Sequence, residues 1–213
     1  MKQATRLQEF AYDSALKKES HSVAEYLLVL QPHEALWKEI VLIKEKFAKD
    51  FDCEMARAGL PYITLATFKQ YQATETHIRQ ALRNSLKTLE PFKIEMKGFG
   101  CFPSHTIYIN IVSKVQIMHT VKVARQGQRF MKIDKNTKPY FITDPHLTIA
   151  RKLLPWQYEK GWLEYQQTDF HERFIADHAL LLKRKQGERY KPVEKFLFQN
   201  KKEEITQRDL FTP

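Results

Sequence analysis

The sequence predicts an α+β protein built from two similar lobes that face each other. Short apolar runs typical of strands are mixed along the chain with segments whose apolar residues recur at helical spacing. Several of the strand-like runs form hairpin-like pairs, a mixture typical of α+β architecture. The segment "PYITLA" at 61–66 is nearly repeated as "PHLTIA" at 145–150. Two near-copies of one strand indicate two related lobes.

The first part of the chain reads as strand, helix, strand, helix. "EYLLVL" at 25–30 is an apolar run closed by a proline, which fits a buried strand. Apolar residues at helical spacing then predict a helix over 33–49. "PYITLATF" at 61–68 reads as the next strand. Spaced apolar residues over 78–89 predict a second amphipathic helix, ended by a proline.

The middle of the chain predicts a hairpin, a helix and the second motif strand. Residues 92–100 and 105–112 are strand-like and are separated by the turn-like "CFPS". A helical pattern follows over 113–126. The second motif lies in the strand-like stretch 144–153, and residues 155–166 predict a helix that opens on a proline.

Two closing strands are predicted at 174–184 and 193–199. The chain therefore divides into an N-terminal extension over 1–20, a single bilobal domain over 21–199 and a polar tail over 200–213. Nothing in the composition indicates a linker between independent domains.

Length and composition favour a cytoplasmic globular protein. The 213 residues are 43% apolar, enough for one substantial core or two small lobes that share one. No run of about 18 apolar residues predicts a membrane span, and the first residues lack the pattern of a secretory signal. Cys53 and Cys101 form no CxxC pair, so we expect neither a disulfide framework nor a metal site.

The charge balance favours a polyanionic partner. Thirty-five Lys and Arg residues against 25 Asp and Glu residues give a formal net charge of +10. Such a field attracts polyanions, of which nucleic acid is the commonest in a cytoplasm. The basic residues are spread along the chain and are densest in "LKRKQGERYK" at 182–191.

The two motifs carry polar side chains that suit a phosphate. Because strand side chains alternate between faces, Tyr62 and Thr64 share one face, and so do His146 and Thr148. If the lobes face each other, these four groups converge in a groove. Two hydroxyls suit the non-bridging oxygens of a phosphate, and His146 can act as general acid or base near neutral pH.

These motifs, with the leading "EYLLVLQP" strand and the "FGCFPSHTIYINI" stretch, resemble the 2H phosphoesterase superfamily, and most closely its 2'-5' RNA ligase-like branch. The resemblance covers about residues 24–198. It implies a bilobal fold with a pseudo-twofold axis and two antiparallel sheets, flanked by helices, around a central groove. It also implies action on RNA or nucleotides with 2',3'-cyclic or 2'-5' phosphodiesters, with no metal or other cofactor. One His of the family pair acts as general base and the other as general acid, and the hydroxyls hold the phosphate.

The sequence departs from the family pattern at one motif position. His146, Thr148 and Thr64 match the pattern, whereas Tyr62 stands where the first His belongs. A tyrosine, with a reference pKa of about 10, is protonated at pH 7 and is a poor base. It can still donate a hydrogen bond or a proton to a leaving oxygen. We therefore expect His146 and Tyr62 as the catalytic pair, with impaired or altered acid–base chemistry.

Three further residues are candidates for the groove. Lys152 continues the face of His146 and could meet a phosphate. Tyr108 could line the groove. Phe68 continues the Tyr62–Thr64 face and could stack a base, although core packing fits it better. A substitute for the missing imidazole is also conceivable, from His33, His105 or His178, although each of these also fits a surface or structural role.

Three functions stay open on the sequence alone. One is a metal-independent phosphodiesterase that works with His146 and an altered partner. Another is a non-catalytic protein that binds RNA or a nucleotide, and the last is a protein-interaction module. The tail contains "QRDLF", in which Gln207, Leu210 and Phe211 resemble a peptide that docks on the DNA sliding clamp.

Overall fold

The computed structural model describes residues 22–201, in which strands and helices are mixed as the sequence predicts. The helices are α2 (Glu34–Asp50), α3 (Glu54–Ala58), α4 (Glu75–Leu86), α5 (Lys114–Ala124) and α6 (Pro155–Tyr165), with 3-10 turns η1 (Gln72–Thr74) and η2 (Arg125–Met131). The strands are β1 (Val23–Leu30), β2 (Ile63–Tyr71), β3 (Phe92–Phe102), β4 (Thr106–Ile111), β5 (Tyr140–Phe141), β6 (His146–Arg151), β7 (His171–Ala176), β8 (His178–Arg184) and β9 (Lys191–Leu197). The predicted N-terminal extension, and the tail residues Gln207, Leu210 and Phe211, lie outside the described residues.

One antiparallel sheet replaces the two that the sequence analysis expects. Its strand order is β7-β3-β4-β6-β2-β1-β8-β9, and the short β5 pairs with β2. The motif strands β2 and β6 are neighbours at the centre of this order. They are joined only through Ile63 and Leu147, whereas β1 pairs with β2 along eight residue pairs. The α+β class is therefore confirmed, and the two halves of the sheet meet through a narrow junction.

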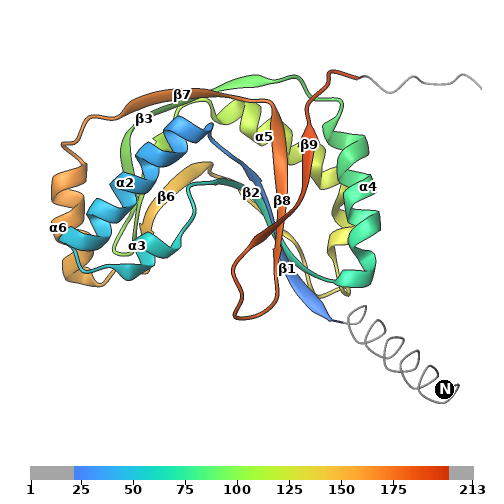
Figure 1. Ribbon diagram of the computed structural model, residues 1–213, viewed down its shortest axis with the longest axis horizontal. Helices are drawn as coiled ribbons and strands as arrows, with labels where there is room; N and C mark the ends of the chain where they lie inside the picture. Colours follow the sequence, from blue (N-terminus) through green and yellow to red (C-terminus); the bar gives the residue numbers. More distant parts are fainter. Residues whose placement is uncertain (1–21, 202–213) are drawn as a thin grey trace, which may run out of the picture.

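The sheet curves so strongly that strands near its two edges are consecutive in the chain. The single strand predicted over 174–184 is wrong, because β7 ends at Ala176 and β8 begins at His178. β7 pairs with β3 at one edge, whereas β8 pairs with β1 near the other edge. No continuous strand could pair with both. The chain bends at Asp177, whose carbonyl accepts a hydrogen bond from the backbone N–H of Phe198, and Figure 1 shows the resulting arch.

The helices form two groups, one for each half of the sheet (Figure 1). α2, α3 and α6 contact β6 or β4, whereas α4 and α5 contact each other together with η2, β9 or β2. α2 follows β1 in the chain yet packs on β6, and α5 follows β4 yet packs on β2. This exchange of helices ties the two halves together beyond their narrow strand junction.

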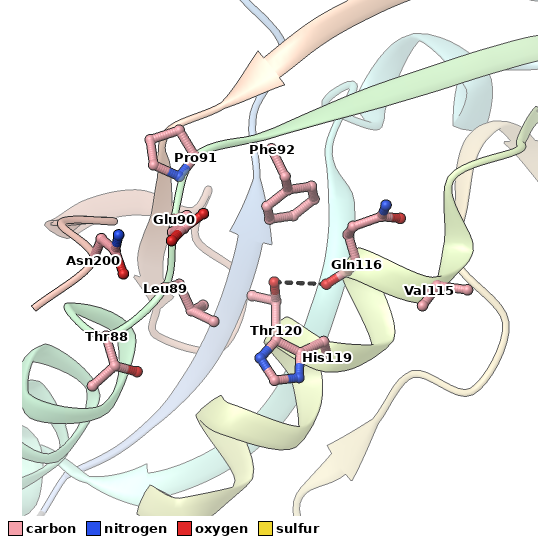
Figure 2. A pocket seen from close by; sticks show the side chains of 10 residues that line it. All are labelled: Thr88, Leu89, Glu90, Pro91, Phe92, Val115, Gln116, His119, Thr120 and Asn200. Carbon is pink, nitrogen blue, oxygen red and sulfur yellow. Dashed lines mark hydrogen bonds between the residues drawn. The ribbon is translucent and has the colours of Figure 1, made fainter. Parts of the chain in front are cut away.

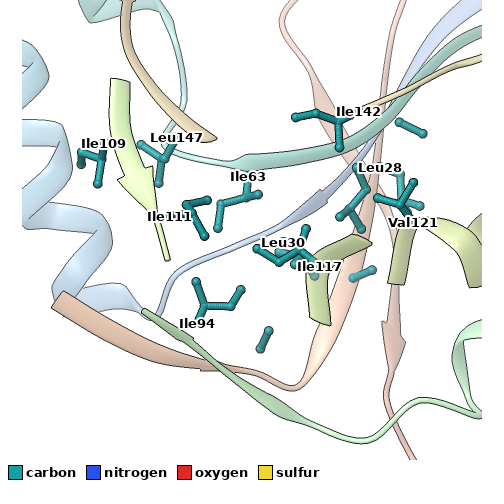
Figure 3. Packing of buried hydrophobic residues seen from close by; sticks show 14 of the residues in the cluster. Leu28, Leu30, Ile63, Ile94, Ile109, Ile111, Ile117, Val121, Ile142 and Leu147 are labelled. Atoms are coloured by element: carbon teal, nitrogen blue, oxygen red, sulfur yellow. The ribbon is translucent and has the colours of Figure 1, made fainter. Parts of the chain in front are cut away.

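A single hydrophobic core runs through both halves. Figure 3 shows Ile109 and Leu147 on one side, Leu28 and Val121 on the other, and Ile63 between them, all of which belong to one buried cluster. Apolar burial of this extent is the main stabilising contribution to the fold. Within residues 22–201, no helix is both long enough and apolar enough to cross a membrane.

Candidate functional site

The pairing of β2 with β6 brings the two sequence motifs side by side. Ile63 and Leu147 are opposite each other and fully buried. In this register Thr64 lies beside His146, and Tyr62 lies beside Thr148. These four side chains alternate with the buried ones and are half-buried. We call the surface that they form the motif face.

The backbone immediately before β6 holds the His146 ring in one orientation. Its Nδ1 lies 2.8 Å from the carbonyl oxygen of Asp144. Because a carbonyl can only accept, Nδ1 must carry the hydrogen, which leaves Nε2 of the neutral ring with a free lone pair. The ring also packs against Phe102 and Tyr108, with centroids 5.0 Å away in each case. His146 is therefore positioned to accept a proton at Nε2, or to donate one when it is protonated.

Tyr108, a candidate from the sequence for lining the groove, is on the strand that pairs with β6 beside the motif face. It pairs with Thr148 in the β4–β6 register and with Gly100 in the β3–β4 register. A Cβ added at Gly100 would lie 2.5 Å from the Tyr108 ring, so only a glycine leaves room for this ring. Burial raises the pKa of Tyr108, with a smaller contribution from the negative charge of Asp144.

Tyr62 contacts a tryptophan from α2. Its ring centroid lies 4.9 Å from that of Trp37. Burial raises the pKa of Tyr62, so its phenol is an even weaker acid than a free tyrosine. The hydroxyl makes no hydrogen bond within residues 22–201. It stays available as a donor to a bound ligand.

The two threonine hydroxyls of the motif face are also available. Neither Thr64 nor Thr148 makes a side-chain hydrogen bond to the part of the chain that the structure describes. Both side chains are half-buried and lie on neighbouring strands. Free hydroxyls in this arrangement can donate to an anion between the strands.

Phe68 does not lie on the motif face, contrary to the sequence prediction. The β1–β2 register shifts between Leu28 and Val29, so that Leu65 is an extra residue on β2. Such a bulge reverses which side chains point to each face of the strand. Phe68 is consequently only 6% exposed and stacks on Tyr26 in the core, with ring centroids 5.1 Å apart.

Lys152 follows the end of β6 rather than continuing it. It is exposed and has a φ of 56°, which is the left-handed region. The alternation that predicted a shared face with His146 therefore stops at Arg151, where β6 ends. Its part in holding a phosphate stays a prediction.

The candidate substitute imidazoles have partners of their own. His33 caps α2, accepting a hydrogen bond at Nδ1 from the Leu36 N–H at 3.3 Å. Nδ1 of His178 lies within hydrogen-bond distance of the Asp177 carboxylate. His105 contacts the hydroxyl of Thr106 at 2.8 Å and the ring of Phe102, which also contacts His146. Of the three, His105 therefore contacts the same ring, that of Phe102, as His146 does.

No group of three or more His, Cys, Asp or Glu side chains that could hold a metal ion exists among residues 22–201. Cys53 is buried and Cys101 is partly buried, and both are free thiols. A separate pocket of about 530 Å³ lies between α5 and the start of β3 (Figure 2). None of the predicted site residues lines it.

Sequence reasoning missed several residues around the motif face. Trp37 lies on the helix that packs across the junction, and the spacing pattern on α2 carries no sign of this contact. Phe102 and Gly100 fall in the "FGCFPSHTIYINI" stretch that the family resemblance singles out, although their roles depend on the β3–β4 register. Lys44 occupies an apolar helical stripe, where a lysine is the one exceptional residue.

Comparison with known proteins identifies a family. A family model described as the 2'-5' RNA ligase superfamily matches residues 32–188 of the chain. No curated protein matches the chain by sequence.

Several solved structures share the fold. LigT of E. coli complexed with 3'-AMP is 13% identical, with a TM-score of 0.58 over 83% of this chain and 99% of that chain. The same protein complexed with NADP+ is 13% identical, with a TM-score of 0.55 over 84% of this chain and 99% of that one. The protein TT0787 of Thermus thermophilus is 18% identical, with a TM-score of 0.56 over 82% and 98% of the two chains. At these identities the likeness shows a shared fold.

Proposed function

Because the chain belongs to the 2'-5' RNA ligase superfamily, we propose that its motif face binds the phosphate of a nucleotide or of an RNA end. The single observation that carries this proposal is the arrangement at the β2–β6 junction. There a fixed imidazole with a free Nε2 lies beside two threonine hydroxyls that have no partner within residues 22–201. Hydroxyl donors and an imidazolium both favour the charged oxygens of a phosphate.

The ligands of a fold relative support this choice. LigT of E. coli has been solved with 3'-AMP, with ATP, with NADP+ and with phosphate. Each of these ligands is or contains a phosphate. The net charge of +10 would also attract RNA, which a cytoplasmic protein would meet in quantity.

The motif face supplies the groups for one proton transfer on each side of a cyclic phosphate. Nε2 of His146 would take a proton from a water that attacks phosphorus, and one P–O bond to the ribose would break. The leaving ribose oxygen would then take a proton, for which the Tyr62 hydroxyl is the candidate donor. Because burial raises the pKa of Tyr62, we expect this step to be slower by about 10²–10⁴ than with a second imidazole.

A non-catalytic binding protein is the second candidate. The raised pKa of Tyr62 favours this candidate. A phenol with a raised pKa gives up its proton reluctantly, so it preserves the shape of the site but supports proton transfer poorly.

Single-turnover hydrolysis of an RNA that ends in a 2',3'-cyclic phosphate separates the two candidates. Wild type, His146→Ala and Tyr62→His are compared, with His105→Ala as the control for the other imidazole that contacts Phe102. A slow wild-type rate that is lost in His146→Ala and raised in Tyr62→His supports an enzyme with an altered partner. No wild-type rate, with tight binding of the RNA, supports the binding protein. Absence of binding in every variant would overturn the proposal itself.

A further inference from the structure

Lys44 is a charged residue in the middle of the buried face of α2. The side chains that share this face are Leu36, Ile40, Phe47 and Ala48. Lys44 itself is only 3% exposed. Lysine is seldom buried to this degree without a partner, because taking an ammonium group out of water is costly. Its partner should therefore reveal why a cation occupies this position.

The partners of Lys44 are two successive carbonyl groups of the second motif strand. Its Nζ donates to the carbonyl oxygen of Thr148 at 2.9 Å and to that of Ile149 at 2.7 Å. Lys44 forms no ion pair with any residue between 22 and 201. Gly59 closes the other side, since a Cβ added there would lie 3.3 Å from Nζ. The ammonium group is thus dedicated to the backbone of β6.

The sheet leaves these carbonyls in need of donors. On one side of β6, the pairing with β2 is limited to Ile63 and Leu147. On the other side, the register with β4 shifts between Ile107 and Tyr108, so Ile149 is an extra residue without a β4 partner. Buried carbonyls without a donor are destabilising. The lysine from α2 supplies the donor at this irregular stretch of β6, through the carbonyl of Thr148, whose side chain belongs to the motif face.

We propose that Lys44 is a positioning residue that holds the His146–Thr148 segment of β6 so that its imidazole and hydroxyl point together toward a ligand phosphate. The proposal rests on the proposed function of the motif face. In this arrangement α2 fixes the geometry of the site through the Lys44 ammonium group, which contacts neither the ligand nor solvent. A displacement of about 1 Å in a positioned group costs up to about 100-fold in function, so the contact should be visible in ligand affinity.

The test compares Lys44→Met with Gln70→Met in the full chain. Met keeps the length and apolar character of the lysine stem but has no donor. Gln70 is a matched control, because it is also 3% exposed and also donates to two carbonyls, those of Phe130 and Lys132. Neither of those carbonyls belongs to β6.

Isothermal titration with adenosine 3'-phosphate is carried out at a temperature where all variants remain folded. We expect Lys44→Met to weaken binding at least about tenfold, and Gln70→Met to leave it within about twofold. If wild type binds the nucleotide, an equal affinity for Lys44→Met, or equal losses for the two variants, would overturn the proposal.

A second measurement reports on positioning without any ligand. Nitrogen-15 NMR of the His146 ring in wild type should show the tautomer with hydrogen on Nδ1, bonded to the Asp144 carbonyl. We expect Lys44→Met to mix the tautomers and Gln70→Met to leave them unchanged. If wild type binds no nucleotide while the ring still responds to Lys44→Met, the proposed function fails and the positioning role stands. An unchanged ring spectrum in Lys44→Met would overturn the positioning role.

Discussion

At the scale of single residues, the chemistry of the motif face depends on contacts with neighbouring residues outside the two motifs. The carbonyl of Asp144 selects the tautomer of His146, and the ring of Trp37 packs against that of Tyr62. The sequence predicts the four facing residues from strand alternation alone. It does not predict their supports, because these lie in the backbone before β6, in the β3–β4 hairpin and in α2, which packs on β6.

Gly100 is the most sensitive of these supports. We expect Gly100→Ala to lower the free energy of unfolding by about 1–3 kcal/mol, because the new methyl group would overlap the Tyr108 ring and force it off its position. Urea unfolding measures the change. Gly127→Ala is the control, since its added Cβ would meet the Ala81 Cβ at 3.4 Å. A Gly100→Ala protein as stable as wild type would contradict the packing described for Tyr108.

The charge on Lys44 predicts an unusual pH dependence. Burial, with a smaller contribution from the positive charge of Arg151, lowers its pKa from 10.5 to about 8, and Cys53 acts in the opposite direction. Between pH 8 and 10.5 the unfolded chain therefore binds more protons at this residue than the folded chain, so stability rises with pH in this window. We expect the unfolding free energy of wild type, minus that of Lys44→Met, to increase by about 3 kcal/mol from about pH 7.5 to about pH 10.5. A flat difference would mean that Lys44 titrates normally.

At the scale of elements, one irregularity in β2 decides which side chains face the ligand. Alternation correctly predicts the faces of Tyr62 and Thr64, but the extra residue at Leu65 then sends Phe68 into the core. A bulge depends on the pairing with β1, which has no signature in the β2 sequence itself. Periodicity is therefore informative up to the bulge and misleading beyond it.

Substitution of Phe68 tests this assignment. We expect Phe68→Ala to cost about 3–5 kcal/mol in unfolding free energy, because a buried aromatic ring that stacks on Tyr26 is removed. Phe68→Leu should cost less and leave nucleotide affinity unchanged. If Phe68→Leu weakens nucleotide binding and spares stability, the ring contacts the ligand and the core assignment is wrong.

At the scale of the whole molecule, the repeat predicted two related halves, and the structure joins them in one curved sheet. The motif strands β2 and β6 are neighbours at the centre of the sheet, so the two duplicated segments contribute side chains to a single surface. The sequence could not predict the joined sheet, because it depends on one residue pair between β2 and β6 and on the bend at Asp177. Neither feature has a sequence pattern from which it could be predicted.

The net charge predicts how the molecule responds to salt. If the basic residues, which are densest at 182–191, contact the RNA backbone, log K for a single-stranded RNA should fall with log salt by about 0.7 for each phosphate neutralised. We expect a steeper slope for a hexanucleotide than for adenosine 3'-phosphate, which offers one phosphate. Fluorescence anisotropy at several salt concentrations measures both slopes. Equal slopes would mean that only the motif face contacts the ligand.

The most direct test of phosphate binding at the motif face is isothermal titration of adenosine 2',3'-cyclic phosphate. Wild type is compared with a double variant, Thr64→Val and Thr148→Val, that removes both hydroxyls at nearly constant volume. Each hydrogen bond to a charged group contributes about 1.5–3 kcal/mol, so the loss of two should weaken binding by at least about 100-fold. The account predicts that wild type binds and that the double variant loses this affinity. Equal binding by the two proteins, or no binding by wild type, would contradict it.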